Sequence, residues 1–261
     1  MEKNQEALEK VADLVKRAKV AGADAADAIY VEAISLSIAC RKGKIETLAR
    51  SEGVDIGLRV FFGKKQAIVS SSDLTNDALN ELVYRSIAMA KLVPEDEFCG
   101  LAPEYLLADK FPDLENYDAV EPSEKELENS AFEAEEAALD VVGVSNSEGA
   151  ESSWGRSFVA LATSNNFVAG RRGTSHSLSV SVLAGEGTEM ERDYDYSVSV
   201  FKEDLDNAKL LGRSAGKKAV ARLKPQKIET AKVPVVFDPR ASNSLLSHFA
   251  NAINGAAVAR G

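Results

Sequence analysis

The sequence is poor in the residues on which many catalytic and metal sites depend. Its 261 residues include two histidines, two cysteines and one tryptophan. Cys40 and Cys99 are too far apart for a CxxC pair, so neither a metal knuckle nor a redox motif is predicted, and both thiols are interpreted as reduced. The chain contains no run of about 18 apolar residues, so no transmembrane helix is predicted. The charged start MEKNQEALEK lacks the apolar region of a secretory signal, which favours a cytoplasmic location.

Basic residues are also in the minority. The 31 basic and 41 acidic residues give a net charge of −10, which repels phosphate backbones and argues against nucleic-acid binding. The imbalance is local, because 15 acidic residues and only two lysines lie between Glu95 and Glu136. Prolines, which interrupt helices and strands, fall in and beside this region at Pro94, Pro103, Pro112 and Pro122. We therefore expect residues 94–122 to form an acidic surface connection.

Hydrophobic periodicity predicts a first lobe over residues 1–93, with two helices around a set of strands. Apolar residues recur every three or four positions in residues 4–21, which predicts a helix. Residues 25–72 alternate instead, with glycines between apolar runs, which predicts a meander of antiparallel strands. A second helix should begin after Asp73 or Thr75 and end before the connection.

Residues 123–232 are predicted to form a second lobe of helices and long antiparallel strands. Ser123 and Glu126 have the spacing of a capping box, so a helix should begin there and continue to about Val141. Another helix is expected over residues 204–221. Strands are expected at residues 141–145, 155–164, 168–183 and 194–201, and turns at residues 146–149, 165–166 and 185–187. The fold class is therefore α+β, with antiparallel or mixed sheets flanked by helices, and the pattern leaves open whether the two lobes share one sheet.

Residues 233–261 are predicted to form a short strand and a last helix. The apolar run Val233–Phe237 predicts a short buried strand. Asp238 and Pro239 then have the pattern of an N-cap and a first helical position. One side of the helix that follows is apolar, yet the chain ends shortly after it. Either another chain covers this side, or the chain is the N-terminal part of a longer protein.

Sequence motifs offer little support for catalysis. The HExxH and Walker patterns are absent, and no GxSxG nucleophile elbow is predicted. Gly53, Gly57 and Gly63 are interpreted as bends among strands rather than as a nucleotide-binding loop. His176 lies in a predicted strand, where a hydrogen-bonded sheet histidine is a simpler interpretation than a catalytic base. For His248, in the last predicted helix, packing or an interface is likewise favoured over catalysis.

Three polar clusters remain as candidates. Glu191–Tyr196 has the sequence ERDYDY and could order a cation, although a solvated strand edge is the simpler interpretation. Arg171 and Arg172 could bind an acidic side chain or a ligand carboxylate, and exposed ion pairs are the simpler interpretation. Four strand serines have no base beside them in the sequence, so none is predicted to be a nucleophile: Ser179, Ser181, Ser197 and Ser199. The residues alone therefore assign no catalytic, cofactor-binding or metal-binding position.

Four segments together resemble the PmbA (TldE) branch of the TldD/PmbA family, historically called modulators of DNA gyrase. They are residues 52–74 (EGVDIGLRVFFGKKQAIVSSSDL), 144–163 (VSNSEGAESSWGRSFVALAT), 173–197 (GTSHSLSVSVLAGEGTEMERDYDYS) and 234–261 (PVVFDPRASNSLLSHFANAINGAAVARG). The resemblance implies a longer chain, of which this sequence is the N-terminal portion and residues 233–261 are the start of a C-terminal, metalloprotease-like and β-rich domain. It also implies a heteromeric cytoplasmic metalloprotease, in which a TldD-type subunit carries a helical HExxxH zinc motif and unfolded peptides are held as extended strands.

The resemblance places the equivalent of that zinc motif in the helix around His248. In one register His248 matches the first histidine, so Phe249 replaces the general-base glutamate and Ile253 replaces the second histidine. In the other register Ser247 matches the first histidine, so His248 replaces the glutamate and Ala252 replaces the second histidine. Either register removes the metal site, because one imidazole cannot hold tetrahedral zinc. We therefore expect a non-catalytic PmbA/TldE-type subunit without a cofactor of its own, and zinc in a TldD-type partner.

Two further expectations concern partners. The alternating residues 173–183 could offer a sheet edge to an extended peptide by strand addition, and self-association is also possible. The alternative function is a non-proteolytic regulatory protein that acts on gyrase or on a toxin–antitoxin pair. A self-contained hydrolase is the least favoured hypothesis, since no nucleophile and base are paired. No membrane partner and no direct nucleic-acid partner are expected.

Overall fold

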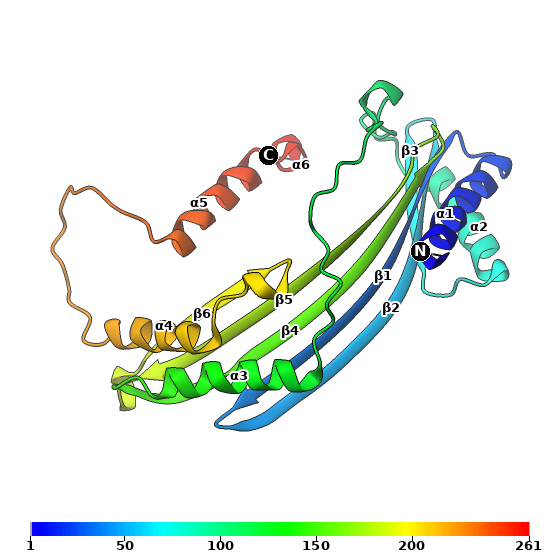
Figure 1. Ribbon diagram of the computed structural model, residues 1–261. Helices are drawn as coiled ribbons and strands as arrows, with labels where there is room; N and C mark the ends of the chain where they lie inside the picture. Colours follow the sequence, from blue (N-terminus) through cyan, green and yellow to red (C-terminus); the bar gives the residue numbers. More distant parts are fainter. Residues whose placement is uncertain (1, 261) are drawn as a thin grey trace. The chain divides into compact units, whose positions relative to one another are not determined.

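A six-stranded antiparallel sheet, in the order β3-β2-β1-β4-β5-β6, organises the first part of the chain (Figure 1). The computed structural model describes residues 2–260, which divide into one unit that ends at Lys224 and a second that begins at Pro225. The strands are β1 (Ala25–Arg41), β2 (Lys44–Phe62), β3 (Lys65–Ser71), β4 (Val144–Thr163), β5 (Val168–Ala184) and β6 (Glu191–Ser199). The α+β class is confirmed, and the sheet is antiparallel throughout.

The two predicted lobes share this one sheet. Strand β1 of the first lobe pairs with β4 of the second from Asp27 opposite Thr163 to Cys40 opposite Ala150. This long ladder answers the question that the sequence pattern left open.

Strand β4 is longer than the sequence pattern predicted. The strands expected at residues 141–145 and 155–164 are one strand, and the turn expected at residues 146–149 is wrong. The pairing with β5 is instead irregular between Ser147 and Gly149. A Cβ on Gly149 would lie 2.7 Å from the Cys40 carbonyl oxygen, so this close approach requires glycine. Bulges and turns use the same small residues, which explains the error.

The predicted bends at Gly53 and Gly57 are also wrong, whereas Gly63 does lie in a turn. Both of the first two glycines are inside β2, opposite Ala33 and Ile29 of β1. A Cβ on Gly57 would come within 3.2 Å of Ile29 Cγ2. The residue is therefore small because a neighbouring side chain occupies the space above it.

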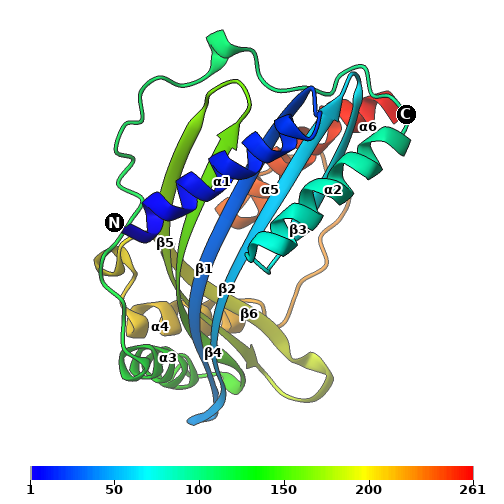
Figure 2. The ribbon, with the colours of Figure 1, turned by 90° about the vertical axis from the view of Figure 1, so that its right-hand side faces the viewer.

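Four helices cover one face of the sheet. They are α1 (Glu2–Val20), α2 (Asn76–Leu92), α3 (Glu124–Leu139) and α4 (Ala208–Ala221). From Ala150 onward, the even-numbered residues of β4 face the helices: Ala160 packs in the α1–α2 core and Ala150 in the α3–α4 core. Because side chains alternate along a strand, both cores lie on the same face. Figures 1 and 2 show the two helix pairs at opposite ends of the strands.

The helix ends follow local signals. Thr75, rather than Asp73, caps α2, and its side chain accepts a hydrogen bond from the Ala78 N–H. The predicted capping box of Ser123 and Glu126 is present at the start of α3. Helix α4 begins later than expected, because Asn207 caps it while residues 202–204 form a separate turn of 3₁₀ helix.

The connection over residues 94–122 contains one short 3₁₀ helix, Glu104–Leu106, but it is only partly at the surface. Asp118 is buried, and Asn116 and Asp118 bond to Thr174 of β5. Glu121 forms ion pairs with Arg50 of β2 and Arg156 of β4. The end of the connection therefore crosses the helix-bearing face between the two helix pairs.

The edge of β5 differs from the expectation for peptide binding. Strand β6 pairs with β5 from His176 to Ala184, so most of the edge proposed at residues 173–183 is already occupied. The strand predicted at residues 194–201 begins earlier, at Glu191, because Glu191 and Arg192 join this pairing.

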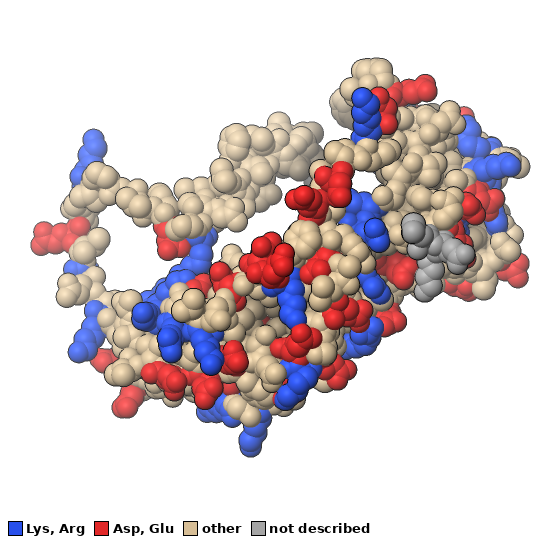
Figure 3. Space-filling model, in the orientation of Figure 1, with Lys and Arg blue, Asp and Glu red and all other residues tan. Residues whose placement is uncertain are grey.

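The second unit contains two helices. The buried strand expected at Val233–Phe237 is wrong: the segment has no strand pairing and its apolar side chains are exposed. Asp238 does cap α5 (Pro239–Ala252), by accepting a hydrogen bond from the Arg240 N–H, and α6 (Gly255–Arg260) follows. Helix α5 is almost entirely tan in Figure 3, because Arg240 is its one charged residue. Within residues 2–260, no helix is long and apolar enough to cross a bilayer.

Candidate functional site

The sheet face opposite the four helices, called here the open face, is rich in small polar residues. Odd-numbered serines of β5 lie on it and alternate with buried residues, as the sequence pattern predicted. Ser177 of β5 and Ser153 of β4 meet across the strands with their Oγ atoms 2.7 Å apart. Tyr194 and Tyr196 of β6 lie on either side of Asp195 on the same face, and their rings stack 6.2 Å apart. None of α1–α4 packs on the open face.

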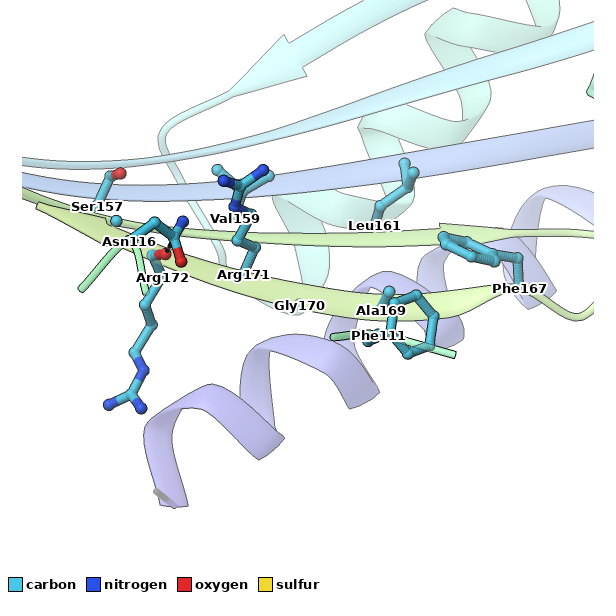
Figure 4. Close-up of a pocket in the computed structure, with 11 residues that line it drawn as sticks. Phe111, Asn116, Ser157, Val159, Leu161, Phe167, Ala169, Gly170, Arg171 and Arg172 are labelled. Carbon is cyan, nitrogen blue, oxygen red and sulfur yellow. Dashed lines mark hydrogen bonds between the residues drawn. The ribbon is translucent and has the colours of Figure 1, made fainter. Parts of the chain in front are cut away.

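A pocket of about 460 Å³ lies at one end of the open face (Figure 4). Strands β4 and β5 supply its apolar floor, mainly Val159, Leu161 and Ala169. Phe111 of the connection closes one side and contacts Phe167 edge to face, with ring centroids 5.9 Å apart. Asn116, Ser157 and Arg171 bring polar groups to the rim. The connection thus converts one end of a flat sheet into a hollow.

The two adjacent arginines of β5 point to opposite faces. Arg171 lies on the open face beside its cross-strand neighbour Val159, whereas Arg172 points the other way and covers the ring of Tyr117 at 4.3 Å (Figure 4). Neither guanidinium has an ion-pair partner within residues 2–260, so the expected exposed ion pairs do not form. Arg171 is therefore an exposed cation at the rim of an apolar pocket.

His176 is a buried residue of the helix-bearing face. Its side chain is 2% exposed, and Nε2 lies 3.2 Å from Oδ2 of Asp118, although the ring N–H is not aligned for a linear hydrogen bond. Burial lowers the pKa of His176 more than the Asp118 carboxylate raises it. The N–H groups of Lys202 and Val120, together with His176, hold the pKa of Asp118 below its usual value. His176 thus fastens the connection to the sheet and does not face solvent.

The carboxylates of Glu191–Tyr196 are used by helix α4. Asp195 lies 2.7 Å from Lys218, and Asp193 lies 3.7 Å from Arg222. Asp193 is buried, so the interpretation as a solvated edge is wrong for this residue. These pairs fix α4 to β6 and leave the carboxylates engaged by cations.

The strand serines act as hydrogen-bonding groups. Ser181 donates to Glu148, Ser197 accepts from the Asp206 N–H, and Ser199 donates to the Phe201 carbonyl. Ser199 is opposite His176 in the ladder, but the histidine Nε2 is directed at Asp118. Ser179 lies on the open face, away from His176.

The residues present do not fit a zinc ion. His248 is exposed on α5, which carries no second histidine and no carboxylate. Throughout residues 2–260, no three histidine, cysteine, aspartate or glutamate side chains lie close enough together to hold a metal ion. Cys40 is buried, and burial, reinforced by Glu135, raises its pKa to about 11.

Neither the pocket nor the partner of His176 was predicted from the sequence. Val159 and Leu161 alternate with buried residues of β4, and this pattern indicated that the two side chains lie on the same face of the sheet. Nothing local to Phe111 or Asp118 indicated that the connection would fold back onto β5, because both contacts join residues more than 50 positions apart.

Comparison with known proteins supports a family assignment. Residues 26–90 match the model described as PmbA/TldA metallopeptidase domain 1, and residues 115–223 match the PmbA/TldA metallopeptidase central domain. The Metalloprotease PmbA homolog of Haemophilus influenzae is 33% identical over 257 residues, which are 98% of this chain and 57% of that protein. Metalloprotease PmbA of Escherichia coli O157:H7 is 30% identical over 91% of this chain and 53% of its own length. The chain thus spans little more than half the length of these relatives.

Solved structures share the fold. A protein from Bacteroides thetaiotaomicron that carries the name of a DNA gyrase modulator superposes with a TM-score of 0.88 at 24% identity, over 95% of this chain and 57% of that one. TldE from Thermococcus kodakarensis superposes with a TM-score of 0.67 at 14% identity, over 80% of this chain and 47% of that one. The matched domain models and the PmbA relatives together show that this chain belongs to the TldD/PmbA family.

Proposed function

We propose that this chain is part of a PmbA/TldE-type subunit of a heteromeric metalloprotease that processes or degrades unfolded peptides. In this proposal the subunit is non-catalytic, and a TldD-type partner supplies the zinc and the general base. The names of the PmbA relatives support the metalloprotease class. The chain covers little more than half of those relatives, so the activity, partner and cytoplasmic location of the whole protein are parts of the proposal.

The single observation that carries the non-catalytic role is the composition of α5. A zinc protease needs two or three histidines or carboxylates around the ion and a base that activates its water. Helix α5 offers the lone imidazole of His248, and Phe249, Ala252 and Ile253 stand at the positions where a helical motif would need further ligands or the base. These side chains can neither coordinate zinc nor accept a proton.

The open face supports a role in handling extended chains. Its central side chains are serines, alanines and glycines, which leave room for side chains of many shapes. Strand β5 alone presents Gly173, Ser175, Ser177, Ser179 and Ser181 in a row. A surface of this kind selects little by side-chain identity, which suits substrates that differ in sequence.

A cleavage assay tests the proposal. The subunit at its full natural length should be assayed with a fluorescently labelled unfolded peptide, alone and after co-expression with a TldD-type partner, with and without chelator. We expect cleavage in the co-expressed sample only, and its loss with chelator or when the partner's zinc-motif histidine is replaced. Cleavage by the subunit alone would contradict the proposal. Peptide binding by the complex without cleavage products in mass spectra would favour the non-proteolytic regulatory alternative.

A further inference from the structure

The pocket beside Arg171 is not accounted for by the role proposed for α5. Its floor and walls are apolar, and its volume of about 460 Å³ is in the range of pockets that bind small molecules or single side chains. The one charge that the open-face residues of β4 and β5 bring to the pocket is the Arg171 guanidinium, because Arg172 points to the other face. Such a site suits a group that is apolar at one end and anionic at the other.

The neighbours of Arg171 across the sheet leave its charge uncompensated. The row of paired residues that starts at Arg171 continues across the sheet with Val159 on β4, Val31 on β1 and Asp55 on β2. Adjacent strands are about 4.8 Å apart, so Asp55 is about 14 Å away along this row. A carboxylate can therefore approach Arg171 without displacing an internal partner, and a guanidinium binds carboxylates in a bidentate geometry.

The edge of β5 beside the pocket has backbone groups directed outward. The Thr174 N–H and the Arg172 carbonyl point away from β4, and Asn116 accepts from the first and donates to the second. Alternate residues of an antiparallel strand direct both backbone groups to the same side, so those of Gly170 also point outward. Strand β6 does not extend to Gly170, since its pairing with β5 ends at His176.

We propose that this pocket binds the C-terminal residue of an extended peptide. Arg171 binds the terminal carboxylate, Leu161, Ala169 and Phe111 surround an apolar last side chain, and the β5 edge at Gly170 pairs with the peptide backbone. The inference builds on the proposed peptide-handling function and specifies the chain end that is recognised. It predicts a preference for peptides that end in a large apolar residue with a free carboxylate.

The test is direct binding to this chain by fluorescence anisotropy. The probe is a fluorescein-labelled hexapeptide that ends in phenylalanine with a free carboxylate, compared with the same peptide as its C-terminal amide and with a version that ends in serine. A charge-assisted hydrogen bond strengthens binding, and partial exposure of Arg171 reduces its contribution, so we expect the acid to bind at least about fivefold more tightly than the amide.

Variants separate charge, apolar contact and folding. Arg171→Gln should lower the affinity for the acid to that for the amide. The matched control is Arg213→Gln, which removes another exposed arginine, on α4, and should leave both affinities unchanged. Phe111→Ser alters a side chain that is 62% exposed, so the fold should tolerate the substitution. The variant should weaken binding of the acid and of the amide by the same factor.

Equal affinity for the acid and the amide, or unchanged binding of the acid by Arg171→Gln, would overturn the inference. A third contradicting result is displacement of the peptide by 3-phenylpropionate with an affinity equal to that of the peptide. The last result would assign the pocket to small free carboxylic acids. The assay uses no partner, zinc or cleavage. Its failure is therefore distinguishable from failure of the proposed protease role, which the co-expression assay measures.

Discussion

Asp118 of the connection lies 3.2 Å from His176 of β5, and this contact joins two segments that are 58 positions apart in the sequence. Asp118 also accepts hydrogen bonds from the N–H groups of Val120 and Lys202. One carboxylate therefore holds the connection, the sheet and the turn before α4 together. The same connection supplies Phe111 to the pocket, so the contact also shapes the candidate site.

The depressed pKa of His176 predicts a loss of stability in mild acid. In the unfolded chain the imidazole binds a proton as the pH falls through its usual pKa of 6.5, whereas the buried imidazole of the folded chain stays neutral to lower pH. Protonation therefore favours unfolding below about pH 6.5, and at higher pH this contribution disappears. Thermal unfolding between pH 8 and pH 5 should show a falling Tm.

Substitution of each histidine identifies the group responsible. His176→Gln removes the titration and should flatten the fall in Tm between pH 6.5 and pH 5, whereas His248→Gln, which alters an exposed residue of α5, should leave it unchanged. If the fall in Tm persisted in His176→Gln and disappeared in His248→Gln, the buried pair of His176 and Asp118 would not be the cause of the pH dependence. Asp118 has a lowered pKa too, but its contribution is lost only below its usual value of 3.8.

Glu135 should be a strong determinant of stability despite its charge. This buried residue of α3 accepts hydrogen bonds from the N–H groups of Lys42 and Gly43, at 2.7 and 3.0 Å, in the turn between β1 and β2. Glu135→Ala removes the acceptor of both hydrogen bonds and with it the link between α3 and this turn, which should cost about 1.5–3 kcal/mol of unfolding free energy. Urea unfolding measures this cost, and Glu136→Ala on the exposed side of the same turn of α3 is the control. Equal effects of the two variants would contradict the role of Glu135.

The close packing of α3 against α4 depends on Gly212. A Cβ there would lie 2.1 Å from the Ala134 carbonyl oxygen. Alanine normally stabilises a helix by about 1 kcal/mol relative to glycine, but here the steric conflict should make Gly212→Ala destabilising by about 1–3 kcal/mol. The neighbouring exposed variant Arg213→Ala should have little effect. A stabilised Gly212→Ala in urea unfolding would mean that the two helices are less closely packed.

The two thiols should differ in reactivity. Cys40 is buried and its pKa is raised to about 11, so little thiolate forms at neutral pH, whereas Cys99 is partly exposed. Iodoacetamide at pH 8 should modify Cys99 first, and Cys40 only when the chain unfolds. Mass spectrometry of the labelled peptides measures the order, and Cys99→Ser isolates the rate at Cys40. Rapid labelling of Cys40 in that variant would contradict its burial.

The parts of the fold that the sequence predicted are those with local causes. Helix α2 ends where its cap and apolar spacing indicate, and the capping box of Ser123 is present. Errors arose where one local pattern has two structural outcomes. The residues around Gly149 suit a turn or a bulge, and the apolar run Val233–Phe237 forms a strand only when another strand pairs with it.

The candidate site was predictable only in part. Alternation in β5 correctly indicated a small polar face, and Arg171 was considered as a ligand for a carboxylate. The pocket itself depends on the contact between Phe111 and Phe167, and the role of His176 depends on Asp118. These contacts are set by the path of the connection, on which residues 94–122 carry no periodic signal.

Metal analysis tests the central claim, that the catalytic zinc is not bound by this chain, most directly. The chain should be purified in the presence of zinc, desalted, and analysed by inductively coupled plasma mass spectrometry beside a complex with a TldD-type partner. We expect substoichiometric zinc in the chain alone, unchanged by His248→Ala, and about one zinc ion per complex. One zinc ion per isolated chain that is lost on His248→Ala would contradict it.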